Sequence, residues 1–221
     1  MRYPINPKYL NLGVIMIINQ WYGDNPNWWI YGPEGHPGID MKTMGTYQYD
    51  LHNGVRVKTM RLPKERDGYI PICATHSGYI TPFFGASLEN GIGWGIKITN
   101  EKEGIQTLYW HLRSSWNSLA SFKGAITTIA RKENEWVREG AIIGIGGNTG
   151  NSTGPHLHFE VREKNNNGKW VKVDPIKRLR DQDIIMQDAK GRYVYQGKTI
   201  TKNEFEATLL KIQNRIKQRS I

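Results

Sequence analysis

Short stretches of alternating apolar and polar residues dominate this chain of 221 residues, and turn-forming residues separate them. Alternation with a period of two predicts β-strands that bury one face. Asn53-Gly54, the favoured pair of a tight hairpin turn, predicts a hairpin over residues 46–61. The remaining strands are expected at residues 70–74, 78–81, 94–99, 105–111, 141–145 and 157–161, of which 94–99 and 105–111 should form a second hairpin. The fold is therefore expected to be mainly β.

Beyond Pro175 the pattern changes from strand-like alternation to helical spacing. Thr201 followed three residues later by Glu204 is a capping-box signature, which marks where a helix begins. Apolar residues then recur every three or four positions, at Phe205, Leu209, Ile212 and Ile216. This spacing predicts one amphipathic, basic α-helix over residues 202–218. Such a helix either packs on the body of the protein or a partner, or binds an anionic surface.

The first 30 residues carry an unusual density of aromatic side chains, among them Trp21, Trp28 and Trp29. Two interpretations stay open for this segment. It is either a flap that packs on the body of the protein, or an aromatic wall that contacts a substrate.

The chain is strongly basic, with a formal net charge of +10 and a sequence pI of about 9.6. A basic surface attracts polyanions, such as nucleic acid, anionic lipid or an anionic cell-wall polymer. The sequence has neither zinc-finger spacing nor an aromatic-basic RNA signature. We therefore expect no specific nucleic-acid partner.

The apolar run at residues 12–18 is too short to span a bilayer, so no transmembrane segment is expected. The same run lacks the cleavage pattern of a signal peptide, and a secreted protein would need another route out of the cell. Cys73, the only cysteine, excludes an intramolecular disulfide. Its apolar neighbours predict a small buried side chain rather than a nucleophile.

Two histidines two residues apart, His156 and His158, are the most informative feature of the chain. In a strand they project from one face, while Leu157 and Phe159 face the other. Imidazole is a common zinc ligand and the usual acid–base group near neutral pH. The pair therefore predicts a metal site, a proton-transfer site, or both.

A second candidate pair is His36 and Asp40, which flank Pro37-Gly38. Proline and glycine argue against a helix, so the segment is expected to be a loop that enters a strand, with Gly38 allowing a tight bend. An imidazole and a carboxylate suit zinc, and either His156 or His158 would complete a three-residue site open to water. His111, at the end of a predicted strand, is a candidate site residue only because of the motifs around it.

With these motifs the chain resembles the lysostaphin-type (LytM-type) zinc endopeptidases of bacterial cell-wall turnover. Four stretches carry the resemblance in the right order, over roughly residues 30–176. They are His36 to Asp40; Gly93-Trp-Gly with Thr107 to Leu112; Val137 to Gly144; and Gly147 to Glu160, which contains the run Gly-Pro-His-Leu-His-Phe-Glu.

The resemblance implies a groove on an antiparallel β-sheet with zinc at its floor. It implies that His36, Asp40 and His158 bind the zinc, while His111 and His156 flank the metal and share the base and oxyanion roles. A zinc-activated water would then hydrolyse peptide bonds in peptidoglycan stems or cross-bridges. The alternative is a protein that keeps the fold but only binds the wall or serves as a structural part of a virion tail.

The chain departs from the family pattern in its insertions and its ends. About 30 residues separate Asp40 from Pro71, and the connection at 113–135 is long. We expect an N-terminal extension (1–29), a peptidase domain (30–176) and a C-terminal extension with the helix (177–221). Without an export signal, action at the bacterial cell wall suggests a phage enzyme, associated with the virion or tail or released at lysis as an endolysin, or else unconventional secretion. Virion or tail partners would then bind through the C-terminal helix.

Two further residues, His76 and Glu160, lie near the motifs. His76, in Thr-His-Ser-Gly, is expected to be a solvated turn residue. Glu160 either hydrogen-bonds a metal ligand from behind or lies at the surface.

Overall fold

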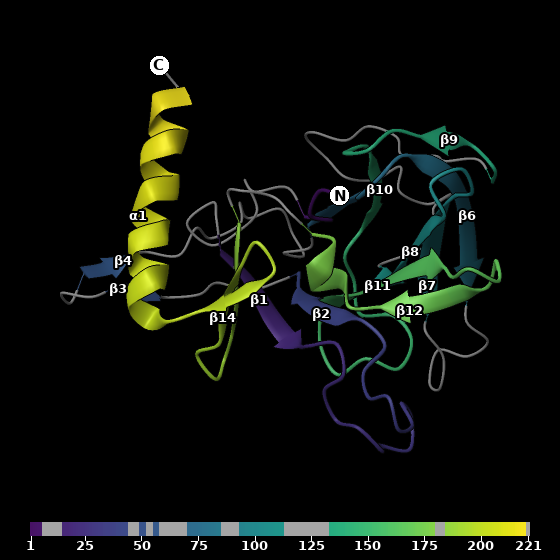
Figure 1. Ribbon diagram of the computed structural model, residues 1–221, viewed down its shortest axis with the longest axis horizontal. Helices are drawn as coiled ribbons and strands as arrows, with labels where there is room; N and C mark the ends of the chain where they lie inside the picture. Colours follow the sequence, from purple (N-terminus) through teal and green to yellow (C-terminus); the bar gives the residue numbers. More distant parts are fainter. Residues whose placement is uncertain are drawn as a thin grey trace.

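A computed structural model describes residues 1–5, 15–43, 49–51, 55–57, 70–84, 93–112, 133–179 and 184–219. In these residues β-strands dominate, and one long α-helix lies near the C-terminus (Figure 1). The mainly β fold class is therefore confirmed. So is the C-terminal helix, α1 (Lys202–Arg219), which begins at the expected capping box: the Glu204 carboxylate accepts from the Thr201 backbone N–H at 2.7 Å.

Most of the strands join one large sheet. In chain order the strands are β1 (Ile15–Gln20), β2 (Ile39–Lys42), β3 (Tyr49–Leu51), β4 (Val55–Val57), β5 (Pro71–Cys73), β6 (Gly78–Phe84), β7 (Trp94–Asn100), β8 (Ile105–Leu112), β9 (Trp136–Val137), β10 (Ile142–Ile145), β11 (His156–Lys164), β12 (Trp170–Val173), β13 (Ile185–Asp188), β14 (Tyr193–Tyr195) and β15 (Lys198–Ile200). The large sheet runs β15-β14-β13-β1-β2-β11-β8-β7-β6-β9, with β12 paired to β11. β5 pairs with β10, and β3 with β4.

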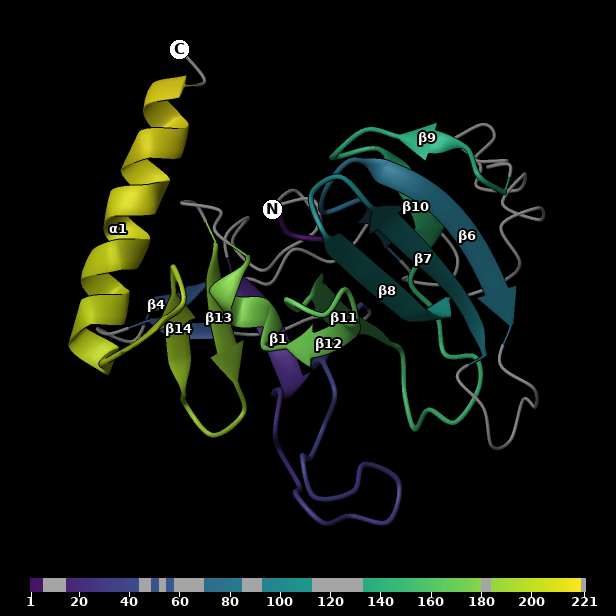
Figure 2. The ribbon, with the colours of Figure 1, turned by 45° about the vertical axis from the view of Figure 1, so that its right-hand side comes forward.

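The pairings within the large sheet are antiparallel, apart from the parallel pair β1 and β13. This order places β2, β11 and β8 side by side, although more than 100 residues of sequence separate β2 from β11. Figure 2 shows β8, β7 and β6 on one side of β11, with β1 and β13 on the other. The centre of the sheet thus joins three distant parts of the chain.

The main hydrophobic core lies between this sheet and the β5–β10 pair. Leu157 and Phe159 on β11 and Tyr109 on β8 contribute to it from the sheet, and Ile72 and Ile143 from the pair. β11 is buried on both faces, because His158 and Glu160 on its other side are also covered. Alternation therefore separates an apolar face from a polar one on the same strand.

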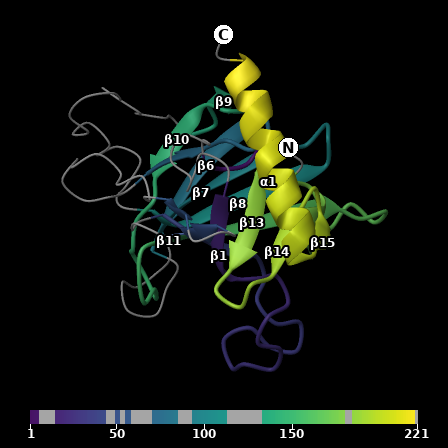
Figure 3. The same cartoon turned by 90° about the vertical axis from the view of Figure 1, so that its left-hand side faces the viewer.

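A second, smaller core holds the C-terminal helix to the sheet, and Figure 3 shows α1 running along β13 and β14. Phe205 and Leu209 pack there against Ile15 and Ile185, and Phe205 stacks on Tyr193 with ring centroids 4.3 Å apart. Most of the predicted apolar residues of the helix thus pack on the body of the protein. Ile216 differs, because its side chain is exposed.

Both predicted hairpins are present, as β3–β4 and β7–β8. β7 and β8 each extend one residue beyond the predicted range, whereas the Asn53-Gly54 turn, the outer residues of the first predicted hairpin and most of the 113–135 connection lie outside the described residues. Cys73 is buried, as expected. Among the described helices, none has the length and apolar character that crossing a bilayer requires.

Candidate metal centre

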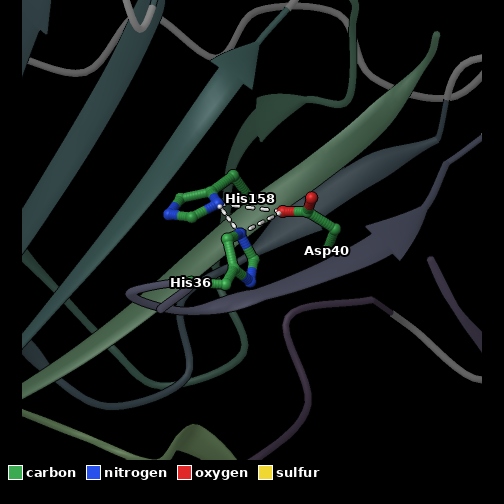
Figure 4. Close-up of side chains that lie close together, drawn as sticks. All are labelled: His36, Asp40 and His158. Atoms are coloured by element: carbon green, nitrogen blue, oxygen red, sulfur yellow. Dashed lines mark hydrogen bonds and ion pairs between the residues drawn. The ribbon is translucent and has the colours of Figure 1, made fainter. Parts of the chain in front are cut away.

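Three of the predicted site residues converge at one point, as Figure 4 shows. His158 Nδ1 lies 2.9 Å from Asp40 Oδ1, and His36 Nε2 lies 3.0 Å from His158 Nδ1. His36 Nε2 is also 3.2 Å from Asp40 Oδ1, which closes a triangle of three potential ligand atoms. All three side chains are buried.

Strand register places two of these side chains together. In the antiparallel pair of β2 and β11, Asp40 stands directly opposite His158, so their side chains share a face and lie close. Their neighbours Ile39 and Phe159 are likewise opposite each other and point into the core. The alternation of β2 and β11 therefore separates a polar pair from an apolar pair.

Gly38 lies in a bend that leads into β2, as the sequence suggested, and it lets this segment approach β11 closely. Its backbone is not left-handed; the constraint is space, because a Cβ at Gly38 would lie 2.4 Å from the Phe159 carbonyl oxygen. His36 is held from the other side, where its backbone N–H donates to Asp24 O at 2.8 Å and its carbonyl accepts from Gly23 N–H at 2.9 Å.

The donor set fits zinc. Zinc bonds of about 2.0–2.1 Å in tetrahedral geometry separate ligand atoms by about 3.3 Å, close to the 2.9–3.2 Å found here. The far nitrogen of each imidazole faces an acceptor: His36 Nδ1 lies 3.2 Å from Trp21 O, and His158 Nε2 lies 3.4 Å from Glu160 Oε1. Metal-binding histidines show this arrangement, because the outer acceptor fixes the tautomer that points a lone pair at the metal.

The charges of the cluster are strongly coupled. Burial would raise the pKa of Asp40, but hydrogen bonds and positive charge from His158 and His36 outweigh it and hold that pKa well below its usual range. Burial would lower the pKa of His158, yet its hydrogen bonds to Asp40 and Glu160 raise it to about 9. Both shifts have the same cause: an anionic carboxylate and two imidazoles crowd together here, an arrangement that favours positive charge between them.

His156 and His111 lie beside the cluster. His156 Nε2 is 3.6 Å from Asp40 Oδ2, and the rings of His111 and His156 are 4.6 Å apart. Each ring has Nδ1 against a backbone carbonyl: His156 at 2.7 Å from Gly154 O, and His111 at 2.8 Å from Thr149 O. These contacts place the proton of a neutral ring on Nδ1 and leave Nε2 as an acceptor.

Burial, with a contribution from His156, lowers the pKa of His111 to about 4. His111 is therefore neutral at pH 7 in this arrangement.

A backbone irregularity brings His111 to this face. Strict alternation would send it into the core with Tyr109, but its φ is +60° and β8 carries one extra residue opposite β7 between Tyr109 and Leu112. This β-bulge turns His111 toward His156 and returns Leu112 to the core. Left-handed backbone in a residue with a Cβ costs free energy and is concentrated at functional sites.

Two residues behind His158 complete its surroundings. Glu160 is 0% exposed, and its second oxygen accepts from Arg162 Nη2 at 2.8 Å. Of the two expectations for Glu160, contact with His158 therefore holds, and surface placement is wrong. The Trp110 ring lies against His158 at 4.7 Å. Nothing in the sequence marked Trp110 apart from its place beside His111.

His76 is not the solvated residue that the sequence suggested, because it is 4% exposed. Its Nε2 lies 3.0 Å from Thr107 Oγ1, and its Nδ1 lies 2.9 Å from Ser77 O. Thr107 Oγ1 also lies 3.1 Å from the Tyr109 hydroxyl, so His76 belongs to a buried network of polar side chains. Burial lowers the pKa of His76.

The N-terminal aromatic residues divide between the two interpretations. Trp21 is buried in the body of the protein, whereas Trp28 and Trp29 are exposed, Trp29 by 82%. They lie in the segment between β1 and β2, which projects beyond the sheet in Figures 1 and 2. Ring contacts link this turn to the cluster, since Trp28 lies 4.9 Å from Tyr31 and Tyr31 lies 5.1 Å from His36.

Known proteins resemble this chain in sequence. A model described as Peptidase family M23 matches residues 50–175, a range that contains His111, His156 and His158 but not His36 or Asp40. The DD-carboxypeptidase/endopeptidase Mpg of Neisseria meningitidis serogroup B is 37% identical over 92 residues, 42% of this chain, and the protein of that name from Neisseria gonorrhoeae is 35% identical. The match spans only 17% of the length of these relatives.

Solved structures resemble the chain as well. The catalytic domain of lysostaphin from Staphylococcus simulans is 25% identical with a TM-score of 0.46, covering 74% of this chain and 92% of that domain. A zinc-containing peptidase from Vibrio cholerae is 20% identical with a TM-score of 0.45, covering 77% of this chain and 38% of that protein.

Proposed function

The chain belongs to peptidase family M23, and from this membership we propose that it is a zinc endopeptidase that cuts peptide bonds in bacterial peptidoglycan stems or cross-bridges. The peptidase domain is assigned to residues 30–176, flanked by the extensions 1–29 and 177–221. The name of its meningococcal relative, DD-carboxypeptidase/endopeptidase, supports peptide bonds as the substrate.

The observation that carries the proposal is the convergence of His36, Asp40 and His158 beside two further histidines. Two imidazoles and a carboxylate from two separate segments form a three-ligand set that leaves a coordination position for water, the arrangement of catalytic rather than structural zinc sites. Zinc held there would polarise the scissile carbonyl and lower the pKa of a water toward about 7.

His156 and His111 supply the proton transfers. In the neutral ring each presents Nε2 as an acceptor, so one of them would accept the proton of the attacking water. The imidazolium formed then donates to the leaving amine, and the second imidazole stabilises charge that develops on the carbonyl oxygen. We assign the two roles to the pair jointly.

We propose that the segment around Trp28 and Trp29, the aromatic turn, borders the substrate groove. Trp28 and Trp29 project from the segment that ends at His36, so a polymer that reaches the metal centre along this side passes over them. Large exposed aromatic side chains in a soluble protein mark interaction sites when they cluster. The basic character of the chain adds attraction to anionic wall polymers.

The test is turnover of purified wall sacculi by the full chain. We expect release of new amino groups, loss of that release with a chelator, and recovery with added zinc. Mass spectrometry of fragments from sacculi of defined cross-link type identifies the bond, whether a glycine bridge, a D-Ala cross-link or a stem-peptide bond. No new amino groups from several sacculus chemotypes would refute hydrolysis. Stoichiometric zinc without cleavage would instead favour a wall-binding or virion-tail role.

A further inference from the structure

A line of hydrogen bonds connects the C-terminal part of the chain to the candidate metal centre. Trp21, which directly follows β1, lies in the middle of this line. Its carbonyl oxygen faces His36 Nδ1 at 3.2 Å, and its indole Nε1–H donates to Asp188 Oδ2 at 2.6 Å. Trp21 and Asp188 are both buried, although 167 residues of sequence separate them.

Asp188 is itself held firmly. It ends β13, and its Oδ1 accepts from the backbone N–H groups of Lys190 and Arg192, at 2.9 Å each. The turn after β13 therefore fixes the carboxylate through Oδ1, while Oδ2 accepts from Trp21 and lies 3.6 Å from Arg192 Nε. The Arg192 guanidinium lies over the Trp21 ring, 5.2 Å from its centroid, so the turn grips both the edge and the face of the indole.

The Trp21 backbone is fixed from a second side. Its N–H donates to Asp24 Oδ2 at 2.9 Å, and its carbonyl also accepts from the Asp24 N–H at 3.2 Å. The Asp24 carbonyl then accepts from the His36 backbone N–H at 2.8 Å. His36 is thus tied to this small loop by its backbone and, through Nδ1, by its ring.

The contact between Trp21 and Asp188 is a polar one, and this bears on its role. Burying a carboxylate costs free energy that an apolar contact would avoid, so packing alone does not call for an aspartate here. A charge-assisted hydrogen bond is instead short and directional, which suits a contact that must hold a ring in one place. Trp21, His36 and Asp188 also lie outside residues 50–175, the part that matches the peptidase family.

We propose that Asp188 is a positioning residue for the zinc centre, and that residues 184–219, the C-terminal module, serve through it to orient His36. Asp188 fixes Trp21, and the Trp21 carbonyl fixes the His36 tautomer with its proton on Nδ1 and its Nε2 lone pair toward Asp40 and His158. This inference rests on the proposed zinc site. It gives the C-terminal module a part in metal binding, although α1 itself packs on the far side of β13 and β14.

The test compares two variants that cut the link with one that weakens the module elsewhere. Asp188→Asn keeps an oxygen for the turn but offers Trp21 Nε1 a donor, and Trp21→Phe removes that N–H while keeping an aromatic ring. Leu209→Ala opens a cavity between α1 and the sheet and leaves the link intact. The zinc dissociation constant of each full chain is measured by competition with a chromophoric chelator, and its stability by urea unfolding.

We expect Asp188→Asn and Trp21→Phe each to raise the zinc dissociation constant about 10-fold or more, the usual scale for outer partners of a metal ligand. The double variant should be no worse than either single one, because both cut the same link. Leu209→Ala should lower stability without changing zinc affinity. The ¹⁵N resonances of the His36 ring add a direct readout: they should report one tautomer in the parent chain and a mixture in the two link variants.

Two results would overturn the inference: unchanged zinc affinity in both link variants, or a loss of affinity in Leu209→Ala equal to theirs. A parent chain that binds no zinc would refute the proposed function itself. A parent chain that binds zinc and cuts sacculi, with link variants that do the same, would refute only the positioning role.

Discussion

Gly38→Ala is expected to disrupt the metal centre without touching any proposed ligand or proton-transfer group. The added Cβ would lie 2.4 Å from the Phe159 carbonyl oxygen and 3.2 Å from Glu160 Cγ. Real Cβ atoms essentially never come closer than 3.0 Å, so the first contact must open by at least 0.6 Å. The atom in the way is backbone, held in the pairing of β2 with β11, and no side-chain rotation relieves the contact.

The size of this shift decides the outcome. Metal sites need their ligands within about 0.5 Å of the productive geometry, and β2 carries Asp40 while β11 carries His158. Pushing the two strands apart near Gly38 therefore moves the ligands by as much as the site tolerates. We expect zinc affinity to fall at least about 10-fold, and the overpacking to cost about 1–3 kcal/mol of stability.

The assay is chelator competition for zinc together with urea unfolding, on the variant and on a matched control. Gly154→Ala is the control, because a Cβ there has nothing within 4 Å and the backbone is not left-handed. The control should keep zinc affinity and most of its stability. If Gly38→Ala bound zinc as tightly as the parent chain, the close approach of the two strands would not be what assembles the site.

The remaining predictions concern the histidines and the aromatic turn. His158→Ala should lose zinc and activity together, whereas His156→Ala should keep most of the zinc while kcat falls about 100-fold; the reverse pattern would exchange their roles. His76→Gln should flatten the pH dependence of urea unfolding. Burial lowers the pKa of His76 in the folded chain, so below about pH 6.5 the unfolded chain gains a proton that the folded chain does not. The parent chain should therefore lose stability as pH falls, by less than about 1.4 kcal/mol for each pH unit. Equal slopes in both proteins would contradict the buried, neutral state. Trp29→Ala should raise KM for sacculi several-fold with kcat unchanged, because the side chain is exposed in the segment that leads to His36; a loss confined to kcat would contradict a role in substrate contact.

Local patterns were sufficient where sequence neighbours decide the structure. The capping box at Thr201 and Glu204 predicted the start of α1, and alternation predicted the hairpin of β7 and β8. The pair His156 and His158 followed from the two-residue period of a strand. In each case the interacting residues are close in sequence, so their spacing carries the information.

The pairing of strands that are distant in sequence could not be predicted from the sequence. Nothing in residues 15–20 indicates that β1 pairs with β13 near the other end of the chain, and the contact of Trp21 with Asp188 follows only from that pairing. The side of β8 on which His111 lies depends on a bulge, and a single inserted residue leaves no periodic signal. His76 was assigned to solvent because its neighbours look like a turn, whereas its burial is set by Thr107 on another strand.

The central claim is that His36, Asp40 and His158 hold one zinc ion. Anomalous diffraction at the zinc edge, from crystals of the metal-loaded full chain, tests it most directly. The account predicts one strong peak per chain, about 2.0–2.2 Å from His36 Nε2, Asp40 Oδ1 and His158 Nδ1. A peak bound by other side chains, or a lack of any peak at this cluster in zinc-saturated crystals, would contradict it.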